Sequence, residues 1–221
     1  MTSEHKVTGK SRTSLAARIA SDIPEGWYVN LGIGIPTLVA DFVPSDREVI
    51  FHSENGILGV GPAPAPEAID YWLVNAGKRY VSLRKGGAYF DQAESFAMIR
   101  GRHIDLCVLG AFEVDDRGNI ANWSVGQEGV PPAVGGAMDL AAAAKRVWVA
   151  MEHTTKNGSP RIVRELTLPL TAVGAVSRIY TNLCVLDVKS DGLHAVELAD
   201  GVTPALLRDV TEPEIHFPKL A

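Results

Sequence analysis

Residues 49–61, VIFHSENGILGVG, are the stretch from which we derive the expected fold of this chain. The apolar, β-branched run from Val49 to Phe51 is typical of a buried strand, and it ends at Ser53-Glu54-Asn55-Gly56. Asn-Gly interrupts a strand, and the glycines that follow permit backbone conformations that a Cβ would forbid. Glu54 therefore stands at the carboxyl end of a strand, where open α/β sheets bind their ligands. A single glutamate beside a turn is most often an exposed loop residue, so the case for Glu54 depends on its neighbours.

The size and composition of the chain predict one α/β domain. Its 221 residues, of which 46% are hydrophobic, can bury a sizeable core without disulfides. We expect residues 1–11 to be a loose leader and residues 12–221 to form the domain. Cys107 and Cys184 both lie in apolar, strand-like runs and are expected to be small buried side chains. No Cys/His pattern in the sequence indicates a metal site.

Charge and hydropathy exclude several classes of protein. The net charge of -5 comes without a block of basic residues, which argues against nucleic acid as a partner. No stretch approaches the ~18 uninterrupted apolar residues of a membrane span. The first residues, MTSEHKVTGKSR, are polar and have no apolar segment behind them, so no secretory signal is visible. We therefore expect a cytoplasmic protein that does not bind membranes.

The first third of the chain reads as a helix, a strand and a glycine turn. Leu15, Ile19 and Ile23 recur at helical spacing before Pro24. A short strand from Tyr28 to Leu31 then enters Gly32-Ile33-Gly34, and a helix over 37–42 is expected after Pro36. The turn is not GxGxxG, so a dinucleotide site is not indicated. Asn30, at the mouth of the turn, offers an amide donor to a ligand, unless it is an ordinary turn-adjacent asparagine.

The rest of the chain alternates strands and helices. The segment DQAESFAMIRG predicts a helix that Asp91 and Glu94 cap and that buries Ala93, Phe96, Ala97 and Met98. His153 is expected to make hydrogen bonds in a loop rather than to act as a base. The other expected elements are strands at 79–83, 104–109 and 146–151, a turn at 115–118, a hairpin of 179–188 with 194–198, and a helix at 204–209. This alternation predicts an α/β fold with an open, mostly parallel sheet and helices on both faces.

A second glycine turn, Gly135-Gly136-Ala137, precedes an alanine-rich helix that begins near Asp139. Main-chain N–H groups at such a helix start can bind an anion or an oxyanion. A tight turn packed against a neighbouring strand would have the same sequence. From the residues alone, both interpretations stay open.

Together these motifs resemble the B (beta) subunit of family I CoA-transferases, the 3-oxoacid CoA-transferases. The resemblance spans residues 12–207 and is carried by VNLGIGIPTLVA, HSENGILGVGP, NAGK, ESFAMIRG, IDLCVLGAFEV, NIANW, AVGGAMDLA and LPLTAVGAVSRIYT. It implies an open α/β sheet like that of ribose-5-phosphate isomerase-like proteins. It also implies that Glu54 is the catalytic nucleophile, surrounded by Asn30 and by the Gly135-Gly136-Ala137 turn. The segment GQEGVPPAVGGAMDLA is more similar to the 3-oxoadipate branch than to the acetoacetate branch.

The sequence departs from the family pattern at two places. GPAPAPEAIDYWLVNAGK lacks the aspartate-rich approach to NAGK, which puts the substrate assignment in doubt but not the reaction. In RGRHID, Arg102 stands where the family usually has a second glycine. An arginine can hold a dicarboxylate by bidentate hydrogen bonds. We favour the other interpretation, that Arg102 is a solvated surface charge.

The resemblance implies a ping-pong reaction in which Glu54 attacks an acyl-CoA and then carries CoA as a glutamyl thioester. It implies succinyl-CoA or another acyl-CoA as donor, 3-oxoadipate or acetoacetate as acceptor, and no metal or other cofactor. It further implies a CoA-transferase A subunit as partner, in an αβ or α2β2 assembly, without which the chain is inactive.

Three alternatives to a transferase fit parts of the sequence. A sugar-phosphate isomerase would use Glu54 as a general base, but no convincing phosphate-binding Lys/Arg group lies near the glycine turns. A non-catalytic acyl-CoA-binding subunit would have no need for the intact SENG motif. A thioesterase differs mainly in letting water reach the anhydride.

Overall fold

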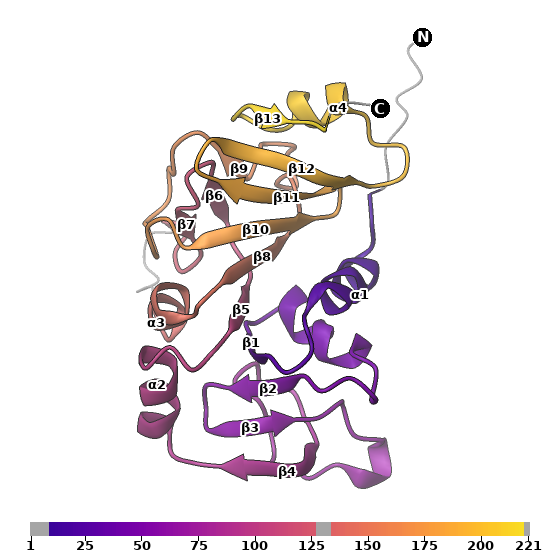
Figure 1. The fold of residues 1–221 in the computed structure, drawn as a ribbon, viewed down its shortest axis with the longest axis vertical. Coiled ribbons are helices and arrows are strands. Elements are labelled where there is room, and N and C mark those ends of the chain that lie inside the picture. Colours follow the sequence, from indigo (N-terminus) through magenta and orange to yellow (C-terminus); the bar gives the residue numbers. More distant parts are fainter. Residues whose placement is uncertain (1–8, 127–133, 219–221) are drawn as a thin grey trace.

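In the computed structural model, which describes residues 9–126 and 134–218, a ten-stranded sheet runs through the molecule (Figure 1). The order of its strands is β13-β12-β11-β10-β8-β5-β1-β2-β3-β4. Residues 1–8 of the expected leader and residues 127–133 of the GQEGVPPAVGGAMDLA segment lie outside the described residues.

The centre of the sheet is parallel, which confirms the predicted α/β class. The parallel strands are β2 (Ile50–Ser53), β1 (Tyr28–Leu31), β5 (Leu106–Leu109), β8 (Val147–Met151) and β10 (Val176–Thr181). Antiparallel strands extend both edges: β3 (Ile57–Val60) and β4 (Leu83–Tyr89) on one side, β11 (Cys184–Lys189) and β12 (Gly192–Leu198) on the other. The short β13 (Ile215–His216) then pairs in parallel with β12.

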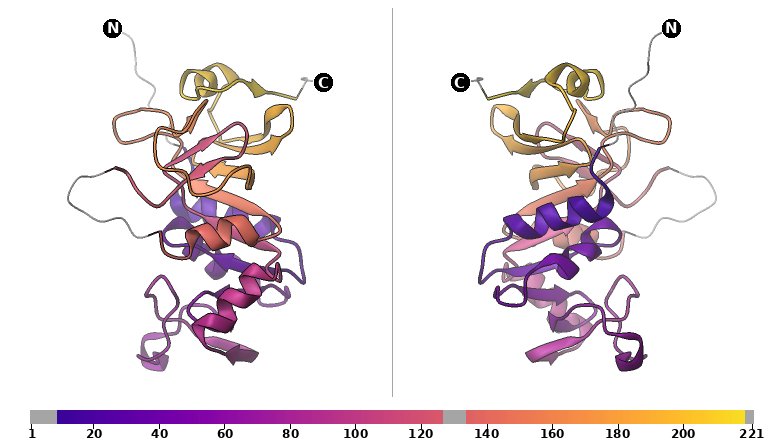
Figure 2. Two further views of the ribbon diagram at one scale, coloured as in Figure 1. Left: turned by 90° about the vertical axis from the view of Figure 1, so that its left-hand side faces the viewer. Right: turned by 90° about the vertical axis from the view of Figure 1, so that its right-hand side faces the viewer.

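Helices cover both faces of the sheet because the central strands are apolar on both faces. Cys107 and Leu109 of β5 share a buried cluster with Ile99 of α2 (Gln92–Arg100) and Leu140 of α3 (Ala137–Ala143). The alternate residues of β5 join a second cluster, formed with α1 (Arg12–Asp22) and the 3-10 helix η1 (Ile35–Phe42). Figure 2 shows α2 and α3 on one side of the sheet and α1 on the other.

Several elements form where the sequence predicted them. The expected strand at 28–31 and the expected helix α4 (Pro204–Asp209) have the predicted bounds. Between β3 and β4 the chain forms one short 3-10 helix, η2 (Pro66–Ala68). Asp91 is the N-cap of α2, and its side chain accepts a hydrogen bond from Glu94 N–H. The predicted buried face of α2 was wrong at Ala93 and Ala97, which are exposed, because the helix turns Ser95 and Ile99 to the core.

Two predicted strands were wrong in their bounds. The strand expected at 79–83 is β4, which begins at Leu83 and continues through the glycine pair. The expected hairpin arm at 179–188 is two antiparallel strands, β10 and β11. The Thr181 hydroxyl accepts hydrogen bonds from the N–H groups of Leu183 and Cys184 and so forms a turn inside an apolar run. The helix expected at 37–42 is the 3-10 helix η1.

A small sheet lies beside the large one. It consists of β7 (Ile120–Ala121), β6 (Glu113–Asp115) and β9 (Ile162–Val163), and it contains the predicted turn at 115–118. His153 is fully buried, and its two ring nitrogens lie 2.9 Å from the hydroxyls of Thr181 and Thr211, which confirms a hydrogen-bonding role. Within the described ranges, no helix has the length and apolar character needed to cross a membrane.

Candidate active site

Glu54 follows β2 in the tight turn that leads to β3. The turn is held rigidly, since the Ser53 hydroxyl donates to Asn55 and accepts from the Ala76 N–H. Gly56 has a φ of 108°, and a Cβ there would lie 2.0 Å from the carbonyl oxygen of Phe90. Only glycine fits this position, so the NG of the SENG motif follows from the path of the backbone. The half-buried Glu54 side chain projects from this fixed support.

The Glu54 side chain lines a cleft of about 490 Å³. All the other site residues predicted from the sequence also line it, namely Asn30, Gly135, Gly136 and Ala137. The carboxylate lies against the second glycine turn, because a Cβ built on Gly136 would stand 2.6 Å from Glu54 Oε2. The carboxyl ends of β1 and β2 and the start of α3 therefore meet at one place.

The surroundings of Glu54 raise the pKa of its carboxyl above the ordinary value. Burial is the main cause, and the negative charge of Asp139 in the first turn of α3 adds to it. Asp139 is itself held by Arg100, through contacts of 2.8 and 3.2 Å to its two carboxylate oxygens. A carboxylate with a raised pKa is more basic, and basicity favours nucleophilic attack.

Asn30 lines the cleft, but its amide group is used within the protein. Its Nδ2 donates to His52, with contacts of 2.9 Å to Nδ1 and 3.3 Å to the main-chain oxygen. Its Oδ1 accepts a weak hydrogen bond from the Cys107 thiol at 3.8 Å. Burial and the nearby Glu54 charge raise the pKa of Cys107, which keeps this thiol protonated and not nucleophilic. Of the two interpretations that the sequence left open for Asn30, the structure does not show the free amide donor, because the amide donates to His52.

His52 lies behind the cleft, where it contacts Asn30, and the sequence analysis did not single it out. It is 2% exposed, and burial lowers its pKa to about 4, so the imidazole is neutral. Because Asn30 Nδ2 donates to Nδ1, the ring proton is on Nε2, which donates to Ser95 Oγ at 2.9 Å. One signal was available, because His52 is a polar residue in the otherwise apolar strand that leads to Glu54.

The N-terminus of α3 brings main-chain donors to the cleft. Gly135 has a φ of 55°, which favours glycine, and it turns the chain into the helix. No side chain caps the helix at Gly136, so its first N–H groups are not covered by a capping oxygen. Such groups can stabilise an oxyanion that forms on a substrate bound to Glu54.

The arginines that line the cleft, Arg12 and Arg161, do not include the one that the sequence singled out. Arg102 is exposed just beyond α2, does not line the cleft, and has a φ of 61°, which explains why a glycine suits this position. Arg161, by contrast, lines the cleft. Among the described residues, its Nε is the one buried side-chain nitrogen or oxygen without a hydrogen-bond partner. An arginine that lines a cleft can bind a substrate carboxylate through its guanidinium group.

Comparison with known proteins identifies the family of this chain. Residues 12–207 match the coenzyme A transferase family, and the chain belongs to that family. It is 57% identical over 188 residues to the B subunit of a 3-oxoadipate CoA-transferase from Pseudomonas putida, covering 85% of this chain and 88% of the relative. The corresponding protein of Acinetobacter baylyi is 51% identical over 95% of both chains. The B subunit of a succinyl-CoA:3-ketoacid coenzyme A transferase from Helicobacter pylori is 44% identical, over 93% of this chain and 98% of the relative.

Solved structures share the fold. An acyl-CoA transferase from Escherichia coli superimposes with a TM-score of 0.74 at 23% sequence identity, over 95% of this chain. The present chain spans 42% of the length of that protein. At this identity the match establishes the common architecture, a sheet with a parallel centre and helices on both faces, which is the fold predicted from the sequence.

Proposed function

We propose that this chain is the B subunit of a 3-oxoacid CoA-transferase that moves CoA from succinyl-CoA to 3-oxoadipate, with Glu54 as the nucleophile. The observation that carries the proposal is the position of the Glu54 carboxylate, half-buried in a cleft and directed at the Gly136 turn. A carboxylate placed for structural reasons alone would be expected to have a cationic or hydrogen-bonding partner that lowers its pKa. Here burial and Asp139 raise the pKa.

Each step of the reaction uses this carboxylate. Glu54 attacks the thioester carbonyl of succinyl-CoA and expels CoA thiolate, which leaves a mixed anhydride. The thiolate attacks the glutamyl carbonyl, releases succinate and forms the glutamyl-CoA thioester. The carboxylate of 3-oxoadipate attacks this thioester and releases CoA thiolate, which leaves a second mixed anhydride. The thiolate then attacks the 3-oxoadipyl carbonyl of that anhydride, which releases 3-oxoadipyl-CoA and restores Glu54. None of these steps is an oxidation or a reduction. We propose no metal or cofactor besides the CoA thioester.

The Gly135-Gly136-Ala137 turn would stabilise the oxyanion of each tetrahedral intermediate. One preorganised donor is worth about 3 kcal/mol in such a step. Asn30 would contribute by fixing His52 and the base of the cleft, since its own amide donates to His52.

The reactive anhydride and thioester must be kept from water, and a second chain closing over the cleft would do this. We therefore propose a CoA-transferase A subunit as partner, in an αβ or α2β2 assembly. The relatives from Pseudomonas and Acinetobacter support this, since both are named as the B subunit of their enzymes.

Two observations favour 3-oxoadipate over acetoacetate as the acceptor. The 3-oxoadipate relatives are 51% and 57% identical to this chain, whereas the succinyl-CoA:3-ketoacid relative is 44% identical. In addition, 3-oxoadipate and succinate are dicarboxylates, and Arg161, which lines the cleft, suits the second carboxylate.

The test uses the chain reconstituted with an A-type partner and given succinyl-CoA without acceptor. We expect a CoA-sized, hydroxylamine-labile mass on the peptide that contains Glu54. Glu54→Ala should fold normally and lose both the adduct and turnover, whereas Glu94→Ala, at an exposed carboxylate, should keep both. Turnover by Glu54→Ala would contradict the assignment of Glu54 as nucleophile. Full activity of the lone chain would contradict the need for an A subunit.

A further inference from the structure

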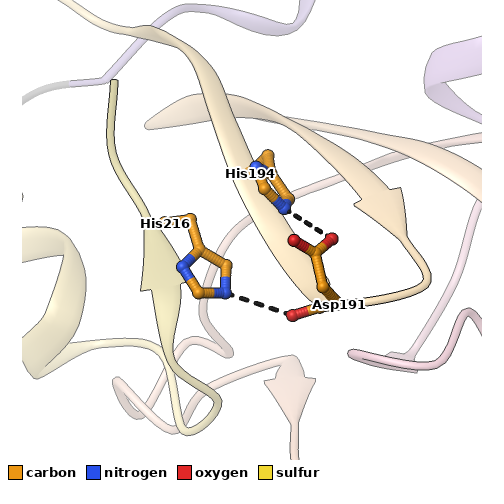
Figure 3. Close-up of side chains that lie close together, drawn as sticks. All are labelled: Asp191, His194 and His216. Atoms are coloured by element: carbon orange, nitrogen blue, oxygen red, sulfur yellow. Dashed lines mark hydrogen bonds and ion pairs between the residues drawn. The ribbon is translucent and has the colours of Figure 1, made fainter. Parts of the chain in front are cut away.

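A second group of chemically active side chains lies far from the cleft. Asp191, His194 and His216 each direct one possible ligand atom to a common point, and these atoms lie within 4.8 Å of one another (Figure 3). His194 Nε2 is 2.9 Å from Asp191 Oδ1, and His216 Nε2 is 3.1 Å from the Asp191 main-chain oxygen. In strand order, β11, β10, β8, β5 and β1 separate β12 from β2, so this group takes no part in the chemistry of Glu54.

The fold fixes this arrangement in two ways. His194 and His216 are register partners in the parallel pair of β12 and β13, so both side chains leave the same face of the sheet. Gly192, with a φ of 116°, reverses the chain directly after Asp191 and brings the carboxylate to the same point. The sequence did not indicate a metal site here, because the two histidines lie 22 positions apart in the chain (216 − 194).

We propose that Asp191, His194 and His216 bind a divalent transition metal ion such as Zn²⁺, with water in the remaining position. Zinc binds imidazole nitrogen and carboxylate oxygen at about 2.0–2.2 Å, which places tetrahedral ligands about 3.3 Å apart. The widest pair of ligand atoms, at 4.8 Å at most, must therefore close by roughly 1.5 Å. Rotation of partly exposed side chains covers this distance, and the ring centroids of the two histidines are already 4.8 Å apart.

The ligand set selects the kind of metal. Two neutral imidazoles and one carboxylate suit Zn²⁺, Co²⁺, Ni²⁺ and Cu²⁺, whereas Ca²⁺ and Mg²⁺ need more oxygen ligands.

The site would fasten the end of the described chain. β13 pairs with β12 at only two register positions, Leu193 with Ile215 and His194 with His216. A metal ion bound by His216, by Asp191 in the β11–β12 turn and by His194 in β12 would link β13 to the sheet. Its bonds would be stronger than the hydrogen bonds between the two short strands.

The experiment uses the untagged full-length chain, because a histidine tag would bind the same metals. Metal-free protein is titrated with Zn²⁺ by calorimetry and with Co²⁺ by visible absorption. We expect one ion per chain and the absorption of low-coordinate cobalt. His194→Ala and His216→Ala should each weaken binding at least tenfold, and the matched control His103→Ala, at another exposed histidine, should bind like the wild type.

A second measurement does not depend on stoichiometry. Zn²⁺ should slow hydrogen exchange of the amides at Ile215 and His216 in the wild type and should have no effect in His194→Ala. The proposal is overturned if the His194→Ala, His216→Ala double variant binds Zn²⁺ as tightly as the wild type, or if Zn²⁺ leaves exchange at β13 unchanged. It is also overturned if Mg²⁺ binds as tightly as Zn²⁺, since the ligand set would then not explain the affinity.

Discussion

The carboxylate of Glu54 lies directly against the backbone of Gly136, 82 residues later in the chain (136 − 54), so that a Cβ at Gly136 would stand 2.6 Å from Oε2. The same Cβ would lie 2.9 Å from the Phe96 ring. The absence of a side chain at Gly136 therefore creates the space in which Glu54 meets the start of α3.

Gly136→Ala should displace the Glu54 carboxylate by about 1 Å and lower kcat about 100-fold, because reactions through a positioned nucleophile tolerate little displacement. The fold should persist, since the φ of -80° at Gly136 suits alanine. The matched control is Gly110→Ala in the same cleft, where the new Cβ would meet only a carbonyl oxygen at 3.6 Å. Steady-state kinetics of both variants test this. Equal activities would contradict the role of the Glu54–Gly136 contact.

The pH dependence of the reaction should respond to charges near Glu54. Glu54 must be ionised to attack, so the acid limb of kcat/KM for succinyl-CoA reports its pKa in the free enzyme. Asp139 raises that pKa, so Asp139→Asn should move the acid limb to lower pH. Arg100→Gln leaves the Asp139 charge uncompensated and should move it to higher pH. Shifts in the same direction in both variants would argue against an electrostatic effect of Asp139.

The hydrogen bond between His52 and Ser95 should contribute to stability. Ser95→Ala leaves the buried Nε2–H of His52 without a partner, which should lower the free energy of unfolding by about 1–3 kcal/mol. Urea denaturation measures this. Ser21→Ala, at an exposed serine of α1, should change stability by no more than about 0.5 kcal/mol. A Ser95→Ala protein as stable as the wild type would mean that this hydrogen bond does not contribute to stability.

Arg161 should determine the preference for a dicarboxylate acceptor. Losing one charge-assisted hydrogen bond of about 1.5–3 kcal/mol should lower kcat/KM for 3-oxoadipate roughly 10- to 100-fold in Arg161→Ala. In a ping-pong reaction this parameter reports only the half-reaction of the acceptor, so acetoacetate, which lacks the second carboxylate, should be unaffected. Arg102→Ala is the control and should leave both acceptors unchanged. An equal loss of kcat/KM for both acceptors would mean that Arg161 supports the structure of the cleft and does not bind the second carboxylate.

The class of fold and the place of Glu54 at the end of a strand could be predicted from the residues alone. The uninterrupted apolar run Leu106–Leu109 predicted a strand covered on both faces, and in the structure it is buried on both. The SENG turn predicted a glutamate at the end of a strand. These features are local, because strand periodicity, turn residues and helix caps act within a few positions of the chain. Where local signals were weak, as at the hidden turn after Thr181, the predicted boundaries were wrong.

Which side chains meet depends on the folded chain as a whole. In the folded chain Glu54 lies against Gly136, and the Asn30 amide donates to His52. Arg161 lines the cleft, whereas Arg102 does not. The fold also gathers Asp191, His194 and His216 at the opposite edge of the sheet. The physical reason is that crossover connections place strands with distant sequence positions side by side, so contacts between their ends depend on strand order and register. Neither quantity is encoded in the residues next to Glu54.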